Sequence, residues 1–160
     1  MPTADLWTFA LACYARPGVE SACLELQEHG ADVCLLLCAA WLEARHIDAT
    51  PERLQQLSEI AMPWQQQTLL PLRRLRQDWR ARAKQDAELS QLREQLKALE
   101  LQAERIVLGR LERVTRGWRS GATSSGWLGL LAAATGSEYR AALAVLRDAA
   151  VQTQRELSGA

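Results

Sequence analysis

Apolar residues recur every three or four positions through most of the chain, a spacing that predicts amphipathic α-helices. Thr3 is placed to cap a first helix, which Arg16-Pro17 ends. A second helix is expected to start at Pro17 and to end at His29-Gly30, where glycine can adopt the left-handed conformation common after a helix. The apolar stripe of the first helix consists of Leu6, Phe9, Ala10, Cys13 and Tyr14.

The next segment is apolar on every side. It runs from Val33 to Leu42 behind a capping residue, Asp32, and polar side chains return at Glu43 and His46. A helix without a polar face has to be surrounded by other helices. We therefore expect a helix over about residues 32–46 to form the centre of the core.

Prolines divide the region that follows. Residues 50–52 read Thr-Pro-Glu, a cap, a first-turn proline and a first-turn acid, and they predict the start of a short helix. Met62-Pro63 is expected to end this helix, and a new one to begin at Trp64. Pro71 lies inside the new helix and predicts a kink, because its ring displaces a backbone hydrogen bond.

No glycine or proline occurs from Leu72 to Leu108. Apolar residues there follow the alternating spacing of a heptad seam, at positions 89, 92, 96, 99, 103 and 106. Extended backwards, the seam meets Arg82 and Asp86, so two interpretations are open: one long bent helix, or a hairpin with a turn near residues 84–86. We favour the hairpin, with two long charged helices at about 64–84 and 87–116.

Residues 117–126 read GWRSGATSSG, the composition of a flexible linker. The linker separates a helical bundle domain, residues 1–116, from a C-terminal helical segment, residues 127–160, which is either docked or mobile. Ser137 is expected to cap the last helix, whose stripe is Tyr139, Ala142, Leu143, Leu146 and Ala150. The predicted fold class is all-α, a multi-helix bundle with a C-terminal helical tail.

The composition agrees with this fold. Leu and Ala dominate the 48% of residues that are hydrophobic, which favours helix over strand. The four cysteines lie in apolar surroundings and form no C-x-x-C pair, so we expect reduced, buried thiols in a cytoplasmic protein. The N-terminus, MPTADLW, has an acid where a signal peptide has bases, and the longest apolar run is half of the roughly 20 residues of a membrane span. We expect neither export nor a membrane span.

The chain has no net charge, but its charges are unevenly distributed. Residues 1–68 hold nine acids and three bases, and residues 69–160 hold ten acids and sixteen bases. Four bases recur at helical spacing in a stripe about 16 Å long: Arg73, Arg76, Arg80 and Lys84. Such a stripe is a solvated face, a surface for an acidic protein, or a surface for nucleic-acid phosphates. The neutral overall charge argues against a dedicated nucleic-acid binder.

No combination of residues predicts catalysis or a cofactor. Glu43 and His46 have the E-x-x-H spacing of di-iron bundles, but such sites need a second motif and further glutamates. We interpret this pair as the solvated end of the central helix. Cys34 and Cys38 could form half of a metal site, but no second pair has a zinc-like spacing, and core packing is the better interpretation.

Two tryptophans flank the predicted linker. Trp118 and Trp127 lie at the two ends of this Gly- and Ser-rich segment, where we expect side chains to be exposed. An exposed tryptophan beside a mobile segment is a common anchor for a protein partner.

Four blocks of the sequence form a recognisable set. They are an aromatic start with Y-x-R-P-G-V at Trp7 and Tyr14–Val19, a leucine-rich helix at Gly30–Leu37, P-L-R at Pro71–Arg74, and E-L-x-A-E at Glu100–Glu104. Through these blocks, residues 5–108 resemble an uncharacterised family of bacterial (proteobacterial) helical proteins of about this length. The resemblance implies a bacterial helical domain and transfers no chemistry.

The sequence therefore favours a non-enzymatic adaptor or regulatory protein, which binds a protein partner or a second copy of itself. The candidate contact residues are Arg73, Arg76, Arg80, Lys84, Trp118 and Trp127. The alternative is an RNA- or ribosome-associated protein that uses the basic helix 73–84. A metal-binding or enzymatic bundle is the least favoured hypothesis. We expect no polar cleft inside the bundle.

Overall fold

The computed structural model describes residues 4–121, 126–135 and 139–159. The described part is helical and contains no β-strand, only an isolated bridge between Ile47 and Ser120. The all-α prediction is confirmed. Within these residues, no helix combines the length and apolar character needed to cross a bilayer.

The first two helices begin slightly later than the sequence suggests. Helix α1 (Leu6–Tyr14) is capped by Asp5, whose carboxylate accepts a hydrogen bond from the Thr8 N–H at 2.8 Å. The expected cap, Thr3, lies outside the described residues. Helix α2 (Val19–Glu28) starts after Gly18 rather than at Pro17, because Gly18 is in the left-handed conformation, with φ of 83°.

Helix α3 (Val33–Ala44) is the centre of the core, as predicted. Every residue from Cys34 to Leu42 is buried, and Asp32 caps the helix by accepting from the Leu35 N–H at 3.2 Å. The helix ends two residues earlier than expected. His46 takes a left-handed conformation, with φ of 59°, and the next N–H, of Ile47, closes the last turn on Leu42.

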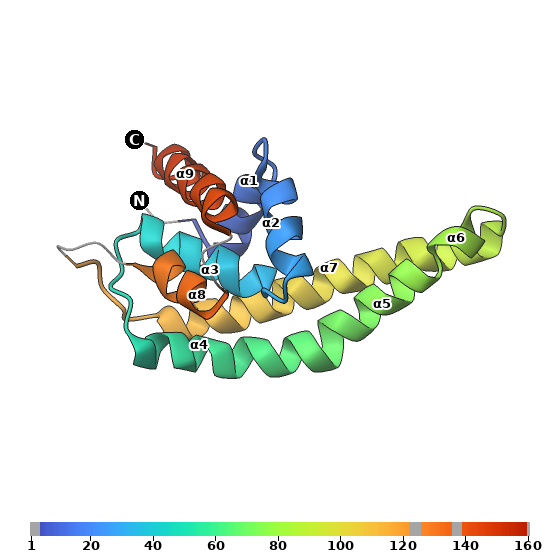
Figure 1. Cartoon of the computed structure of the whole chain (residues 1–160), viewed down its shortest axis with the longest axis horizontal. Coiled ribbons are helices and arrows are strands. Elements are labelled where there is room, and N and C mark those ends of the chain that lie inside the picture. Colours follow the sequence, from blue (N-terminus) through green and yellow to red (C-terminus); the bar gives the residue numbers. More distant parts are fainter. Residues whose placement is uncertain (1–3, 122–125, 136–138, 160) are drawn as a thin grey trace.

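The prediction that Met62-Pro63 ends a helix is wrong. Helix α4 (Pro51–Trp64) continues through Pro63 into a π-helical turn, η1 (Gln65–Leu69), and then into α5 (Leu70–Asp78). In this wider turn the Leu70 N–H donates to the Gln65 carbonyl, five residues back. The turn lies directly before Pro71, whose ring removes a backbone hydrogen bond, and it lets the helix continue past that proline. The kink expected at Pro71 is the bend between α4 and α5 in Figure 1.

Of the two interpretations of the long helical region, the hairpin is correct. After the short helix α6 (Arg80–Ala83) the chain turns, and Asp86 caps α7 (Ala87–Thr115) by accepting from the Leu89 N–H at 3.1 Å. Helices α5 and α6 pack along α7. Figure 1 shows this hairpin projecting beyond the other helices. We refer to residues 70–99 as the arm.

The predicted heptad seam of α7 is half right. Leu96 and Ala103 are buried, but Leu92, Leu99 and Ile106 are 51%, 50% and 39% exposed. A coiled-coil seam faces one partner, whereas α7 packs against α4, η1, α5 and α6 on one side and against α1 and α3 on another. Its buried face consequently follows Leu96, Glu100, Ala103, Val107, Leu108 and Leu111.

The C-terminal segment is docked. Helix α9 (Arg140–Leu157) packs against α1, α2 and α3, and α8 (Trp127–Thr135) packs against α3 (Figure 1). The predicted stripe of the last helix is buried in the same core cluster as α3. The expected cap, Ser137, lies outside the described residues. The Gly121 N–H donates to the His46 carbonyl at 2.7 Å, so this part of the predicted linker is attached to the bundle.

Candidate functional site

The basic stripe predicted from the sequence divides into two parts in the structure. Arg80 and Lys84 are exposed near the tip of the arm. Arg73 and Arg76 instead turn towards α7, and their side chains are only 13% and 27% exposed. The prediction of one continuous basic surface is wrong, because a buried carboxylate on α7, Glu100, draws these two arginines inward.

Glu100 is the centre of an ion cluster at the base of the arm. Its Oε2 accepts a hydrogen bond from Arg76 Nε at 2.6 Å, and its Oε1 lies 3.3 Å from both Arg76 Nη2 and Arg73 Nε. The Gln27 amide lies beside Arg73, and we assign its oxygen to the side that faces the guanidinium, where it accepts from Arg73 Nη2 at 2.9 Å. Buried charges persist when they are paired and hydrogen-bonded in this way. The cluster therefore joins α2, α5 and α7.

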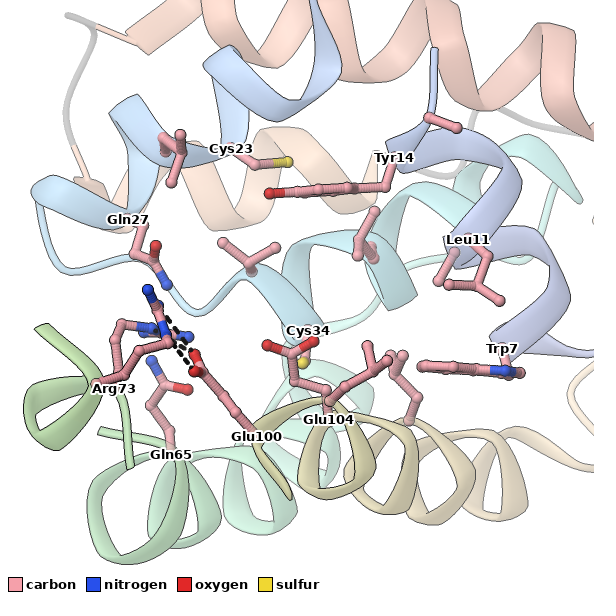
Figure 2. Close-up of a pocket in the computed structure, with 18 residues that line it drawn as sticks. Trp7, Leu11, Tyr14, Cys23, Gln27, Cys34, Gln65, Arg73, Glu100 and Glu104 are labelled. Carbon is pink, nitrogen blue, oxygen red and sulfur yellow. Dashed lines mark hydrogen bonds and ion pairs between the residues drawn. The ribbon is translucent and has the colours of Figure 1, made fainter. Parts of the chain in front are cut away.

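A cavity of about 310 Å³ adjoins this ion cluster. Residues of α1, α2, α3, η1, α5 and α7 line it. The cavity therefore lies where the arm meets the remaining helices, which we call the body. In Figure 2, Arg73, Gln27 and Glu100 form one end and Trp7 and Leu11 the other. The expectation that the bundle contains no polar cleft is therefore wrong.

Glu104 lies between the two ends of the cavity (Figure 2). Among the described residues, no hydrogen bond or ion pair reaches its carboxyl group. Burial, and secondly the charge of Glu100, raise the pKa of Glu104 to about 7, although Arg73 and Arg76 oppose the shift. This carboxyl group therefore changes its protonation state near neutral pH.

The cavity could not be predicted from the spacing of apolar residues, because Glu100 and Glu104 are acids in a helix rich in charges. The sequence feature that could have located the cavity is the set of four blocks that carry the family resemblance. Each of the four blocks contributes lining residues, among them Trp7, Tyr14, Cys34, Arg73 and Glu100. The blocks are far apart in the sequence and meet around this one cavity.

One family model matches residues 5–111 of the chain, which is about two thirds of its length. The family is described as a protein of unknown function, DUF2390. The chain belongs to the DUF2390 family. The comparisons find no matching curated protein and no matching solved structure. The DUF2390 match includes α1 to α6 and most of α7, and hence every residue that lines the cavity.

The two tryptophans beside the linker are not both exposed in this DUF2390 protein. Trp127 is fully buried, and its indole N–H donates to the Ile47 carbonyl at 2.7 Å. Trp118 is half-buried and stacks on Trp127 with ring centres 5.9 Å apart, while the Arg53 guanidinium lies 4.8 Å from the Trp118 ring. The expectation of an exposed anchor at Trp127 is wrong, because this ring fills the core.

Glu43 and His46 do not converge on one site. The Glu43 carboxylate accepts from Arg147 Nε at 2.8 Å and from the Leu128 N–H at 3.3 Å, so it attaches α3 to α8 and α9. His46 is exposed. The interpretation of the pair as solvated is therefore right for His46 and wrong for Glu43. Within the described ranges, no three His, Cys, Asp or Glu side chains group as a metal site would require.

All four cysteines are buried and free. All four lie in the core cluster, and two of them, Cys23 and Cys34, also line the cavity. Burial raises the pKa of Cys13 to about 11 and that of Cys23 to about 12, which keeps these sulfur atoms protonated. The prediction of buried thiols is confirmed.

Proposed function

We propose that this DUF2390 protein is a non-enzymatic interaction module whose arm binds an acidic surface on a partner protein. The projection of the arm carries this proposal. The chief contacts of α5 and α6 are with η1, α7 and each other, so the remaining faces of this hairpin are open to a partner (Figure 1).

The charge of the arm supports an acidic partner. Residues 70–99 hold eight bases and four acids, whereas the whole chain is neutral. Four of these bases are exposed on α5, on α6 or just after it, and they are Arg74, Arg80, Arg82 and Lys84. A localised excess of one charge steers an oppositely charged partner and sets the orientation in which it binds.

Exposed leucines favour a protein partner over nucleic acid. Leu75, Leu92 and Leu99 are 39%, 51% and 50% exposed on the same arm. Protein interfaces combine apolar contacts with charged ones, whereas nucleic-acid affinity comes mainly from phosphate contacts. The inward turn of Arg73 and Arg76 shortens the row of bases that could follow a phosphate backbone.

The positions of the cysteines and histidines support a non-enzymatic role. The cysteines are buried with pKa values raised by burial, as for Cys13, so none is suited to act as a nucleophile. His29 Nδ1 contacts the Glu25 carbonyl in its own helix, and His46 lies at an exposed helix end. Reduced, buried thiols also support a cytoplasmic location.

The decisive experiment compares two triple variants in which the same charge is removed from different places. The arm variant is Arg80→Gln, Arg82→Gln and Lys84→Gln, and the body variant is Arg119→Gln, Arg140→Gln and Arg155→Gln, all at exposed positions. Each protein is crosslinked at native expression level and purified by affinity, with and without nuclease. Mass spectrometry then quantifies each captured protein.

We expect the arm variant to lose a specific protein partner at least tenfold, while the body variant and nuclease treatment leave its capture unchanged. The purified partner should bear an acidic surface, and its affinity should fall with added salt. Equal capture by the two variants would contradict the proposal. Loss of the partner on nuclease treatment would favour the RNA-binding alternative, and capture of the chain itself would favour self-association.

A further inference from the structure

Three polar groups face the cavity at the base of the arm without a protein partner. They are the Glu104 carboxyl, the Tyr14 hydroxyl and the Gln65 amide, and within the described residues no hydrogen bond reaches any of these side chains. They come from α7, α1 and η1. By contrast, Arg73, Arg76 and Glu100 engage one another at the polar end of the cavity.

The opposite end of the cavity is apolar. Trp7 and Leu11 of α1 lie there (Figure 2), and Leu108 of α7 is a further apolar residue that lines the cavity. The volume of about 310 Å³ is at the lower limit of small-molecule sites. At roughly 30 Å³ for a water-sized group, the space corresponds to about ten non-hydrogen atoms.

We propose that this cavity binds a small organic cation, whose ammonium group pairs with Glu104 and whose apolar body lies against Trp7 and Leu11. The Tyr14 hydroxyl and the Gln65 amide supply further hydrogen bonds to the ligand. This inference concerns a site separate from the exposed tip of the arm, and it holds whatever protein the arm binds.

The arrangement of charges favours a cation over an anion. Both arginines at the cavity are already paired with Glu100, at 2.6 Å for Arg76 and 3.3 Å for Arg73. An anion would have to compete with Glu100 for them and would lie beside Glu104. An ammonium group, in contrast, gives the half-buried Glu104 carboxylate the partner that the protein does not supply.

The proposal predicts a specific dependence on pH. An aliphatic ammonium group stays protonated up to about pH 10. The change in affinity near neutral pH therefore comes from the ionisation of Glu104, with its pKa of about 7. The charged or titratable groups around Glu104 are Tyr14, Asp32, Cys34, Arg73, Arg76 and Glu100. Binding requires the ionised carboxylate, and affinity should therefore fall about tenfold from pH 8 to pH 6.

The test uses the whole chain, residues 1–160, and three probes that each carry a phenyl ring. Isothermal titration calorimetry measures the binding of 2-phenylethylamine, its neutral analogue 2-phenylethanol and the anion 3-phenylpropionate. We expect one saturable site per chain for the amine, at least tenfold weaker binding of the alcohol, and still weaker binding of the anion. Tryptamine and n-hexylamine serve as further amines of different shape.

Two substitutions locate the site. Glu104→Gln keeps the side-chain size, and we expect it to remove both the preference for the amine over the alcohol and the dependence on pH. Leu11→Trp places an indole at the apolar end of the cavity and should weaken all probes. Leu11 is 49% exposed, so the larger side chain has room to form without disrupting the core. Glu94→Gln, on an exposed face of α7, is the matched control and should bind like the wild type.

Circular dichroism verifies that each variant is folded before the titrations are interpreted. Four outcomes would overturn the proposal: no saturable binding of any of the three amines, equal binding of amine and alcohol, preferred binding of the anion, or unchanged amine binding in a folded Glu104→Gln protein. The anion result would assign the cavity to Arg73 and Arg76 instead. The proposed cation site would be supported by saturable amine binding that both Glu104→Gln and Leu11→Trp weaken.

Discussion

Arg76 Nε lies 2.6 Å from Glu100 Oε2, and this ion pair joins the two sides of the arm at its base. Arg73 approaches the other oxygen of the same carboxylate at 3.3 Å. A single buried acid thus holds two arginines that would otherwise extend the basic surface of the arm. The pairing determines both the stability of the hairpin and the charge that it presents to solvent.

Removal of Glu100 should therefore destabilise the protein strongly. Glu100→Ala leaves two partly buried guanidinium groups without their carboxylate, and the loss of one partner of a buried pair costs about 3 kcal/mol or more. Urea unfolding followed by circular dichroism measures the change in unfolding free energy. The control is Glu94→Ala on the same helix, where the side chain is 67% exposed and pairs with Lys97 at 3.0 Å. It should cost less than about 1 kcal/mol, and equal losses in the two variants would contradict the assigned role of Glu100.

Glu104 should make the protein less stable at alkaline than at acidic pH. Its folded-state pKa of about 7 lies above its ordinary value of 4.5, so the folded state binds the proton more tightly. This contribution to stability is complete below about pH 4.5 and is lost as the pH rises to about 7. Glu104→Gln removes the cost of burying the ionised carboxylate, and we expect the free energy of unfolding of the variant to exceed that of the wild type by about 3 kcal/mol at pH 8 but not at pH 4.5.

Thermal unfolding of both proteins at the two pH values measures this difference. Each comparison is made between wild type and variant at one pH, so the effect of every other titrating group cancels to first order. A difference that does not change between pH 4.5 and pH 8 would show that Glu104 has an ordinary pKa.

Trp127 should contribute far more to stability than its neighbour Trp118. Trp127 is fully buried and donates to the Ile47 carbonyl at 2.7 Å, whereas Trp118 is half-buried. Trp127→Ala should cost about 3–5 kcal/mol, the usual loss for a large aromatic side chain in a core. Trp118→Ala should cost clearly less. Chemical denaturation of the two variants compares them directly, and a larger loss for Trp118→Ala would contradict the docking of the C-terminal segment seen here.

Helix positions followed from the sequence wherever local chemistry determines them. Asp32 and the apolar run up to Leu42 specify α3 and its burial, and Asp86 specifies the turn of the hairpin. These features depend on capping groups and on residues close in sequence. Pro63 shows the limit of such reasoning, because α4 continues through this proline instead of ending at it.

The cavity depends on contacts between distant parts of the chain, which the pattern of residues does not contain. Arg73 and Glu100 both occur in charged helices that suggest solvent-facing positions. Only the folded hairpin brings them together, across 27 positions in the sequence. The same geometry rotates α7 so that Leu99, a predicted seam residue, is half exposed. The buried and exposed faces of a helix that packs against several other helices therefore could not be assigned from the spacing of its apolar residues alone.

The four thiols should resist modification in the folded protein. Cys13, with a pKa raised by burial to about 11, has a thiolate fraction of about one in a thousand at pH 8, and the thiolate is the reactive form. We expect almost no reaction with an aromatic disulfide reagent in native buffer and reaction of all four thiols in denaturant. Local opening should expose the cavity wall first, so Cys23 and Cys34 should be alkylated before Cys13 and Cys38 when iodoacetamide labelling is mapped by mass spectrometry. Rapid labelling of Cys38, which is fully buried in α3, would contradict the central position of that helix.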